Sequence, residues 1–72
     1  MAEDRVKETC RLIRAARSHW DAHHNAATRM IRQKALALYD TLTEAEKDRI
    51  PQALRVWLRY RSEKYFGTRR RP

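Results

Sequence analysis

The chain has 72 residues, and its 17 Lys and Arg against 9 Asp and Glu give a formal net charge of +8. One Gly and two Pro are too few for a β-sandwich, a barrel or a disordered linker, and no apolar run approaches the ~18 residues of a membrane span. We therefore expect an all-α protein with one helical domain over residues 1–67 and a flexible basic tail over residues 68–72.

The N-terminus and the cysteine content bear on location. The chain starts with Glu3 and Asp4 after its first two residues, whereas a secretory signal begins basic and then turns apolar. The single Cys10 cannot form an internal disulfide, which is usual in a reducing compartment. These features predict a cytoplasmic protein that does not associate with a membrane.

Helical spacing begins near Glu3 and continues to Tyr39. Apolar or small residues recur there at steps of three and four, which places them on one stripe of a helix at ~100° per residue. We expect one continuous helix of ~50 Å at 1.5 Å per residue, with a kink at residues 23–25 as the alternative. The stripe consists of Val6, Cys10, Ile13, Ala16, Trp20, Ala27, Ile31, Ala35 and Leu38.

A short second helix is predicted by a capping box. Thr43 and Glu46 are three apart, so the threonine hydroxyl and the glutamate carboxylate can each accept from the other's backbone amide. Leu42 precedes the cap and is expected to pack as a hydrophobic staple. This helix should run from Glu44 to Ile50.

Pro51 marks the start of the third predicted helix. The residue before a proline avoids the α region, whereas proline itself suits the first position of a helix. We expect this helix to run from Pro51 to about Phe66 and to stop before Gly67. Its apolar face is expected to hold Ile50, Leu54, Trp57, Leu58 and Tyr65.

The long first helix is expected to fold back against the two shorter ones. Its ~50 Å exceeds the ~35 Å of the other two helices combined, so part of its apolar stripe should remain uncovered. An uncovered stripe predicts docking on a larger protein or self-association. The core should join Val6, Ile13, Trp20, Ile31 and Leu38 to Leu54, Trp57, Leu58 and Tyr65.

Basic side chains on the first helix are the main candidate binding residues. Lys7, Arg11, Arg14, Arg29 and Arg32 fall within a sector of ~60° beside the apolar stripe. Such a row suits a phosphate backbone or an acidic groove, and a solvated polar face is the alternative.

The C-terminal part of the chain supplies the other candidates. Arg61 is the unusual one, because its spacing places it inside the apolar stripe of the third helix, where a charge must snorkel, pair or stack on a ring. The full set is Arg55, Arg59, Tyr60, Arg61 and Phe66 on the third helix, and Arg69, Arg70 and Arg71 in the tail.

Catalysis and metal binding are not expected. A chain with one Gly cannot form a glycine-rich phosphate loop, and short helices rarely enclose a substrate pocket. His19 and His23 have a spacing compatible with a shared metal, but no third ligand is evident, so we interpret them as packed or surface histidines. We therefore predict no enzyme activity, no cofactor and no metal site.

Three functions remain open. The first is an adaptor or regulator that docks on a larger acidic protein or complex through the apolar stripe and its flanking arginines. The second is sequence-tolerant binding of RNA or DNA through phosphate contacts. The third is a structural homodimer that closes the stripe. The predicted apolar excess places docking slightly ahead, since phosphate binding does not need a long exposed apolar stripe.

Overall fold

A computed structural model describes residues 2–62 and residue 64, with residues 2 and 3 described as backbone only. The described part of the chain consists of helices and turns, which confirms the all-α class. Among these helices, none combines the length and apolarity that crossing a membrane requires. In chain order the elements are α1 (Ala2–Asp21), α2 (Asn25–Tyr39), α3 (Glu44–Asp48), α4 (Gln52–Val56) and the π-helical turn η1 (Trp57–Arg61).

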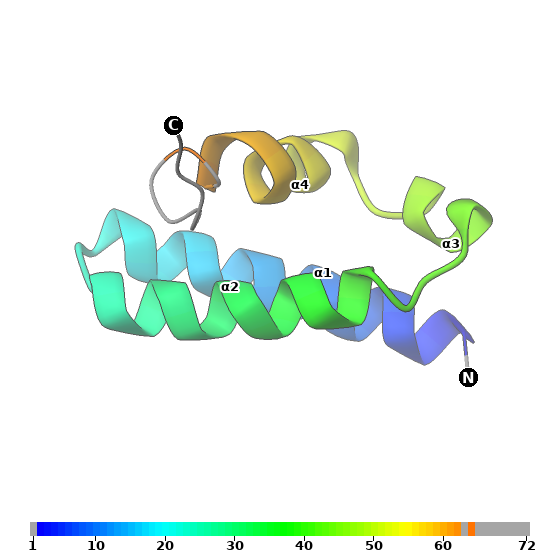
Figure 1. Cartoon of the computed structure of the whole chain (residues 1–72), viewed down its shortest axis with the longest axis horizontal. Helices are drawn as coiled ribbons and strands as arrows, with labels where there is room; N and C mark the ends of the chain where they lie inside the picture. The colour runs from blue at the N-terminus through cyan, green and yellow to red at the C-terminus, as the bar shows by residue number, and fades with distance from the viewer. Residues whose placement is uncertain (1, 63, 65–72) are drawn as a thin grey trace, which may run out of the picture.

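The first 39 residues form a helical hairpin, so the prediction of one continuous helix is wrong. α1 ends at Asp21, the chain reverses over residues 22–24, and α2 returns antiparallel beside α1 (Figure 1). The described part of the chain extends 33 Å along its longest principal axis. One helix over residues 3–39 would alone measure ~50 Å, so it could not fit within this length.

The reversal follows from the backbone at His23, which has a positive φ of 64°. A residue in this left-handed region ends an α-helix. The amide of His24 donates to the carbonyl of His19 at 2.8 Å, and the amide of His23 donates to the carbonyl of Trp20 at 3.0 Å. These two bonds are those of a Schellman motif, in which His23 occupies the position that glycine usually takes.

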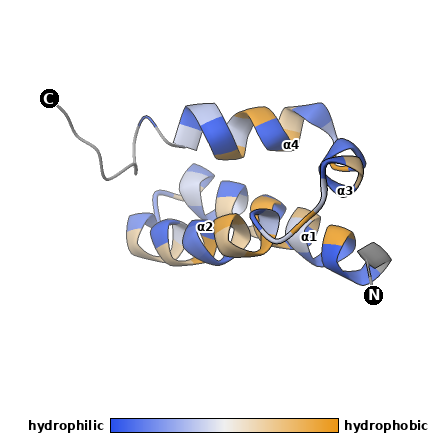
Figure 2. Ribbon diagram, turned by 45° about the vertical axis from the view of Figure 1, so that its right-hand side comes forward, coloured by the Kyte–Doolittle hydropathy of each residue, from blue (hydrophilic) through white to orange (hydrophobic). Residues whose placement is uncertain are grey.

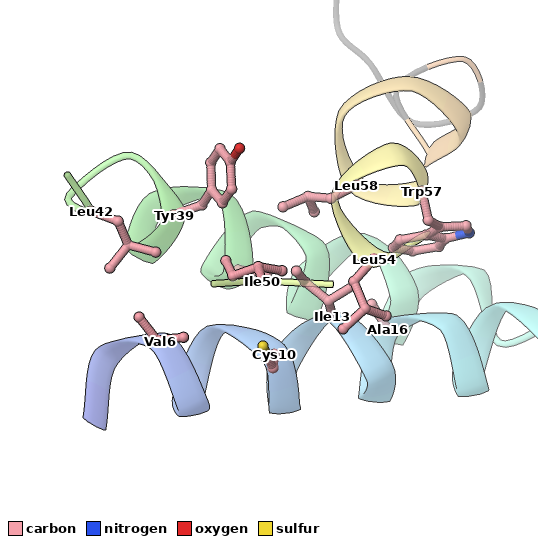
Figure 3. Packing of buried hydrophobic residues seen from close by; sticks show 11 residues of the cluster. Val6, Cys10, Ile13, Ala16, Tyr39, Leu42, Ile50, Leu54, Trp57 and Leu58 are labelled. Carbon is pink, nitrogen blue, oxygen red and sulfur yellow. The ribbon is translucent and has the colours of Figure 1, made fainter. Parts of the chain in front are cut away.

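The second layer consists of α4 and η1, which lie across the hairpin, while α3 sits at the end where α2 finishes (Figure 1). Apolar ribbon segments alternate with hydrophilic ones along the helices (Figure 2), as expected for elements that each bury one side. In the core, Leu54 from the second layer lies beside Ile13 and Ala16 of α1 (Figure 3). The buried cluster is Val6, Cys10, Ile13, Ala16, Ala35, Tyr39, Leu42, Ile50, Leu54, Trp57 and Leu58.

The predicted core residues are largely those that the two layers enclose. Trp20 and Ile31 are partly buried against the cluster, Leu38 is half-buried, and Tyr65 lies outside the described residues. The α1 part of the stripe, from Val6 to Ala16, is buried inside one chain. The expected ~50 Å stripe on one helix is therefore wrong, and its α1 part offers no docking surface. Trp20, Ala27, Ile31 and Leu38 remain partly exposed.

The capping box that starts α3 is present as predicted. The amide of Thr43 donates to Oε1 of Glu46 at 2.8 Å, and the amide of Glu46 donates to Oγ1 of Thr43 at 3.2 Å. Leu42 before the cap is buried. The helix ends at Asp48, two residues earlier than expected, and Pro51 caps α4 as the residue before its first turn.

The π-helical turn η1 changes the register of the last helix. The amide of Ser62 donates to the carbonyl of Trp57, five residues back, and Ser62 is buried. In an α-helix the residue above Trp57 would be Arg61. Because the π-helical turn holds one more residue, Ser62 takes the position above Trp57 and Arg61 turns out to solvent. The predicted place of Arg61 within the apolar stripe is therefore wrong.

We predict that Trp57→Ala lowers the free energy of unfolding by ~3–5 kcal/mol, because it removes a large buried ring that packs against Trp20 at 6.0 Å between centroids. Urea titration followed by circular dichroism measures this. Trp57→Phe is the matched control: it keeps a ring, and the buried indole Nε1 has no acceptor among the described residues. Equal losses in both variants would contradict the packing role.

We also predict a pH-dependent contribution from Glu46. The backbone hydrogen bond from Thr43 holds the pKa of Glu46 below its ordinary 4.5, and the guanidinium of Arg5 at 3.6 Å adds to this. Because the folded pKa is the lower one, this stability is complete above the ordinary value and is lost as the pH falls through the folded value. Urea titrations at several pH values measure it.

Two variants isolate this contribution of Glu46. Glu46→Gln should show less loss of stability on acidification than the wild type, because the titrating group is gone. Thr43→Ala should lose about 1 kcal/mol at neutral pH yet keep most of the acid dependence, because its backbone amide still faces Glu46. An unchanged acid dependence in Glu46→Gln would contradict the assignment.

Candidate functional site

The predicted row of basic residues is divided by the hairpin. Lys7, Arg11 and Arg14 stay together on the exposed side of α1, whereas Arg29 is exposed on α2, which runs the other way. Arg32 is only 4% exposed. The five residues therefore do not form one continuous ladder along a single helix.

Within this group Arg11 already has a partner in the next turn of α1. Its Nε donates to Oε1 of Glu8 at 2.9 Å, and its Nη2 donates to Oε2 of the same carboxylate. The hydrogen bonding lowers the pKa of Glu8 and raises the pKa of Arg11. Both side chains are largely exposed, so the pair adds little stability.

Arg32 is buried and makes an internal hydrogen bond, so its side chain does not belong to an exposed row of basic residues. Its Nε donates to Oγ of Ser62 at 2.6 Å, and that hydroxyl donates to the carbonyl of Leu58 at 2.8 Å. The chain of bonds joins α2 to the end of η1. Arg32 is buried because the reversal at residues 22–24 turns this side of α2 toward the second layer.

A cleft of about 490 Å³ opens between the C-terminal end of α2, α3 and the α4–η1 segment. It brings together Arg55, Arg59 and Tyr60, which are predicted binding residues, with side chains that the sequence did not single out. We call it the α2–α4 cleft. Its lining consists of Tyr39, Asp40, Glu44, Lys47, Gln52, Arg55, Val56, Arg59 and Tyr60.

Two cations of the cleft make cation–π contacts with the ring of Tyr39. The Nζ of Lys47 lies 5.0 Å from the centroid of the Tyr39 ring, and the Cζ of Arg59 lies 5.8 Å from it. The ring itself is 9% exposed and belongs to the core. Cation–π contacts of this length hold both charges at the cleft without neutralising them.

Each cation of the cleft also has a carboxylate nearby. Arg55 Nη1 lies 3.6 Å from Asp48 Oδ1, and Arg59 Nη1 lies 3.8 Å from Asp40 Oδ1. The Lys47–Glu44 distance is 3.7 Å. These distances exceed those of hydrogen-bonded ion pairs, and the three acidic side chains are mostly exposed to solvent. Such pairs are weak, so other carboxylates can compete for the cations.

The α4–η1 side of the cleft also presents apolar surface. Val56 is 38% exposed and Tyr60, four residues later, is 72% exposed. Tyr60 lies off the buried face, as its spacing predicts. Arg61 is exposed beyond the cleft lining, whereas Phe66, Arg69, Arg70 and Arg71 lie outside the described residues. The described cleft thus combines three cations with an exposed aliphatic and an exposed aromatic side chain.

Comparison of this chain with known proteins finds no matching family model, no similar curated protein and no similar solved structure. The geometry of the described residues is therefore the basis on which a function is proposed.

For Arg32 we predict a stability defect and no specific binding defect. Arg32→Ala should lower the free energy of unfolding by about 2 kcal/mol through loss of a buried charge-assisted bond to Ser62. Arg14→Ala, at an exposed position of α1, should stay within about 0.5 kcal/mol of the wild type. Urea titration measures both changes. If Arg32→Ala leaves the free energy of unfolding unchanged, Arg32 is again a candidate binding residue.

Proposed function

We propose that this protein is a small non-enzymatic adaptor or regulator whose docking surface is the α2–α4 cleft. Its occupant is an acidic segment of a larger protein that carries an aliphatic or aromatic side chain. The observation that supports this most is the convergence of Lys47, Arg55 and Arg59 beside the exposed Val56 and Tyr60. This surface replaces the uncovered stripe of the first helix as the site of docking.

The cations of the cleft are available to an acidic partner. Its lining holds three cations, Lys47, Arg55 and Arg59, against two acids, Asp40 and Glu44, while Asp48 outside the lining lies 3.6 Å from Arg55. Incoming carboxylates take the place of the loosely held acids, and each arginine donates to a carboxylate through two N–H groups. The net charge of +8 adds long-range attraction that speeds the encounter.

Arg55 is the more enclosed of the two cleft arginines. Its side chain is 31% exposed, against 50% for Arg59, so part of its guanidinium remains open to a ligand. A charge-assisted hydrogen bond is stronger where water is partly excluded. We therefore expect Arg55 to contribute more than Arg59 to binding of a carboxylate.

The apolar residues of the cleft supply the anchor contact. Tyrosine is frequent among the residues that dominate binding free energy, and Tyr60 offers most of its ring to solvent. The cleft volume of about 490 Å³ lies within the ~300–1,000 Å³ typical of ligand sites. A short segment with one apolar side chain between acidic residues matches this size and composition.

Binding of RNA or DNA is the second candidate, and it uses a different surface. Lys7 and Arg14 are exposed on α1, outside the cleft, and neither has an ion pair among the described residues. Free cations of this kind contact phosphates and make affinity fall steeply with salt. Variants on the two surfaces therefore separate the two functions.

We predict that two charge-matched double variants differ in their affinity for an acidic peptide. Arg55→Glu with Arg59→Glu and Lys7→Glu with Arg14→Glu each change the charge by minus four, from +8 to +4. A labelled peptide with Asp and Glu around a central Leu, Phe or Tyr should bind the cleft variant at least about tenfold more weakly, a loss of ~1.4 kcal/mol. The α1 variant should bind it nearly as well as the wild type. Fluorescence polarisation measures both, and circular dichroism checks that each variant keeps its helices.

The same pair of variants gives the result that would overturn the proposal. If both lose peptide affinity equally, net charge rather than the cleft attracts the peptide. If the α1 variant alone loses binding to a labelled single-stranded RNA, and no acidic peptide binds the wild type, nucleic-acid binding is the better function. Tyr60→Ala, which leaves the charge unchanged, tests the apolar contact separately.

A further inference from the structure

We infer that His19 and His24 form a site for a divalent transition-metal ion at the α1–α2 turn, with Zn²⁺ as the ion that the geometry fits best. Their Nδ1 atoms face each other at 3.5 Å. The ring centroids lie 5.7 Å apart with an angle of 41° between the planes, so the two rings are tilted against each other. This pair differs from the His19 and His23 pair that the sequence spacing suggests.

The distance between the two nitrogens suits a shared metal. With Zn–N bonds of ~2.0–2.1 Å, two nitrogens 3.5 Å apart subtend about 115–120° at the metal, close to the tetrahedral angle. Adjacent ligands of a square-planar ion would lie only about 2.9 Å apart at the same bond length. Without a metal the same two nitrogens are within reach of a direct hydrogen bond. The observed spacing fits a tetrahedral ion that takes the place of this contact.

The backbone of the turn holds the two histidines in this position. On a continuous helix, residues five apart point ~140° away from each other around the axis. The left-handed conformation of His23 brings His24 back over the end of α1, and the 2.8 Å bond from the His24 amide to the His19 carbonyl fixes the two backbones. The carbonyl of His24 in turn accepts from the amide and hydroxyl of Thr28.

The site is open on its outer side. His24 is exposed and His19 is half-buried, so solvent reaches both rings. No group of three or more His, Cys, Asp or Glu side chains in the described residues is placed to hold a metal. Two histidines thus supply two ligands, and water or a ligand from a partner completes the tetrahedron. A bound ion joins the end of α1 to the start of α2 and stabilises the hairpin by linkage.

The test uses the full chain without a histidine tag and ZnCl₂ as the probe. Isothermal titration calorimetry should give one Zn²⁺ per chain. Nuclear magnetic resonance of the imidazole nitrogens should show shifts at His19 and His24 and little change at His23. Thermal melts should move to higher temperature as Zn²⁺ is added, because the ion binds only the folded turn.

Variants then identify the ligands. His19→Ala and His24→Ala should each lower Zn²⁺ affinity at least about tenfold. His23→Asn is the matched control, since asparagine tolerates a positive φ and the change removes a neighbouring histidine that is not a ligand. It should bind Zn²⁺ as the wild type does. Far-UV circular dichroism of the metal-free variants shows whether each keeps the hairpin.

Three results would overturn the inference. The first is no heat and no imidazole shift on the wild-type chain at a large excess of Zn²⁺. The second is a shift at His23 as large as that at His19 and His24, which would mean that the ligands are wrongly assigned. The third is an equal loss of affinity in His23→Asn and His19→Ala. The resonance measurement needs no variant, so the inference stays testable even where His24→Ala fails to fold.

Discussion

The left-handed backbone at His23 is the constraint on which the rest of the structure depends. It ends α1, and the Schellman bonds to His19 and Trp20 send α2 back alongside α1. The apolar stripe, which would stretch over ~50 Å of a single helix, thereby closes on itself and on the second layer. The same reversal turns Arg32 inward and sets His24 opposite His19. Packing, polar bonding and the proposed metal site thus have one common cause.

A second departure from regular geometry, the π-helical turn η1, decides which residues of the last helix are buried and which line the proposed docking cleft. The added residue in the turn places Ser62 in the interior, where its hydroxyl oxygen accepts a hydrogen bond from Nε of Arg32. The hydrogen bond from Arg32 to Ser62 joins α2 to the end of η1, and it therefore restricts how the last helix can rotate on the hairpin. With that rotation fixed, Arg61 points to solvent and Tyr60 remains at the rim of the cleft.

The predictions that succeeded are those that depend on neighbouring residues. The capping box joins Thr43 and Glu46 within one turn. The spacing of apolar residues from Val6 to Ala16 predicts a buried helical face without any knowledge of the helix that packs against it. The hairpin was missed because histidine takes a position where glycine is the usual signal, and because the apolar steps continue in phase across the turn from Trp20 to Ala27. The cleft was missed for another reason: Tyr39, Lys47 and Arg59 come from three different elements, and spacing along one helix cannot bring them together.

The two proposed sites lie at opposite ends of α2, and this bears on how they work. The proposed metal site lies just before the first residue of α2 and the cleft lies at its last, so the helix, about 22 Å long, separates them. A metal ion at the turn therefore touches no residue of the cleft. Inside the cleft, every cation already has a carboxylate within 4 Å, so the proposed docking would exchange one set of carboxylates for another. Because such an exchange would change the total electrostatic energy little, we expect selectivity to come from the fit of the arginine forks and from the apolar contact with Val56 and Tyr60.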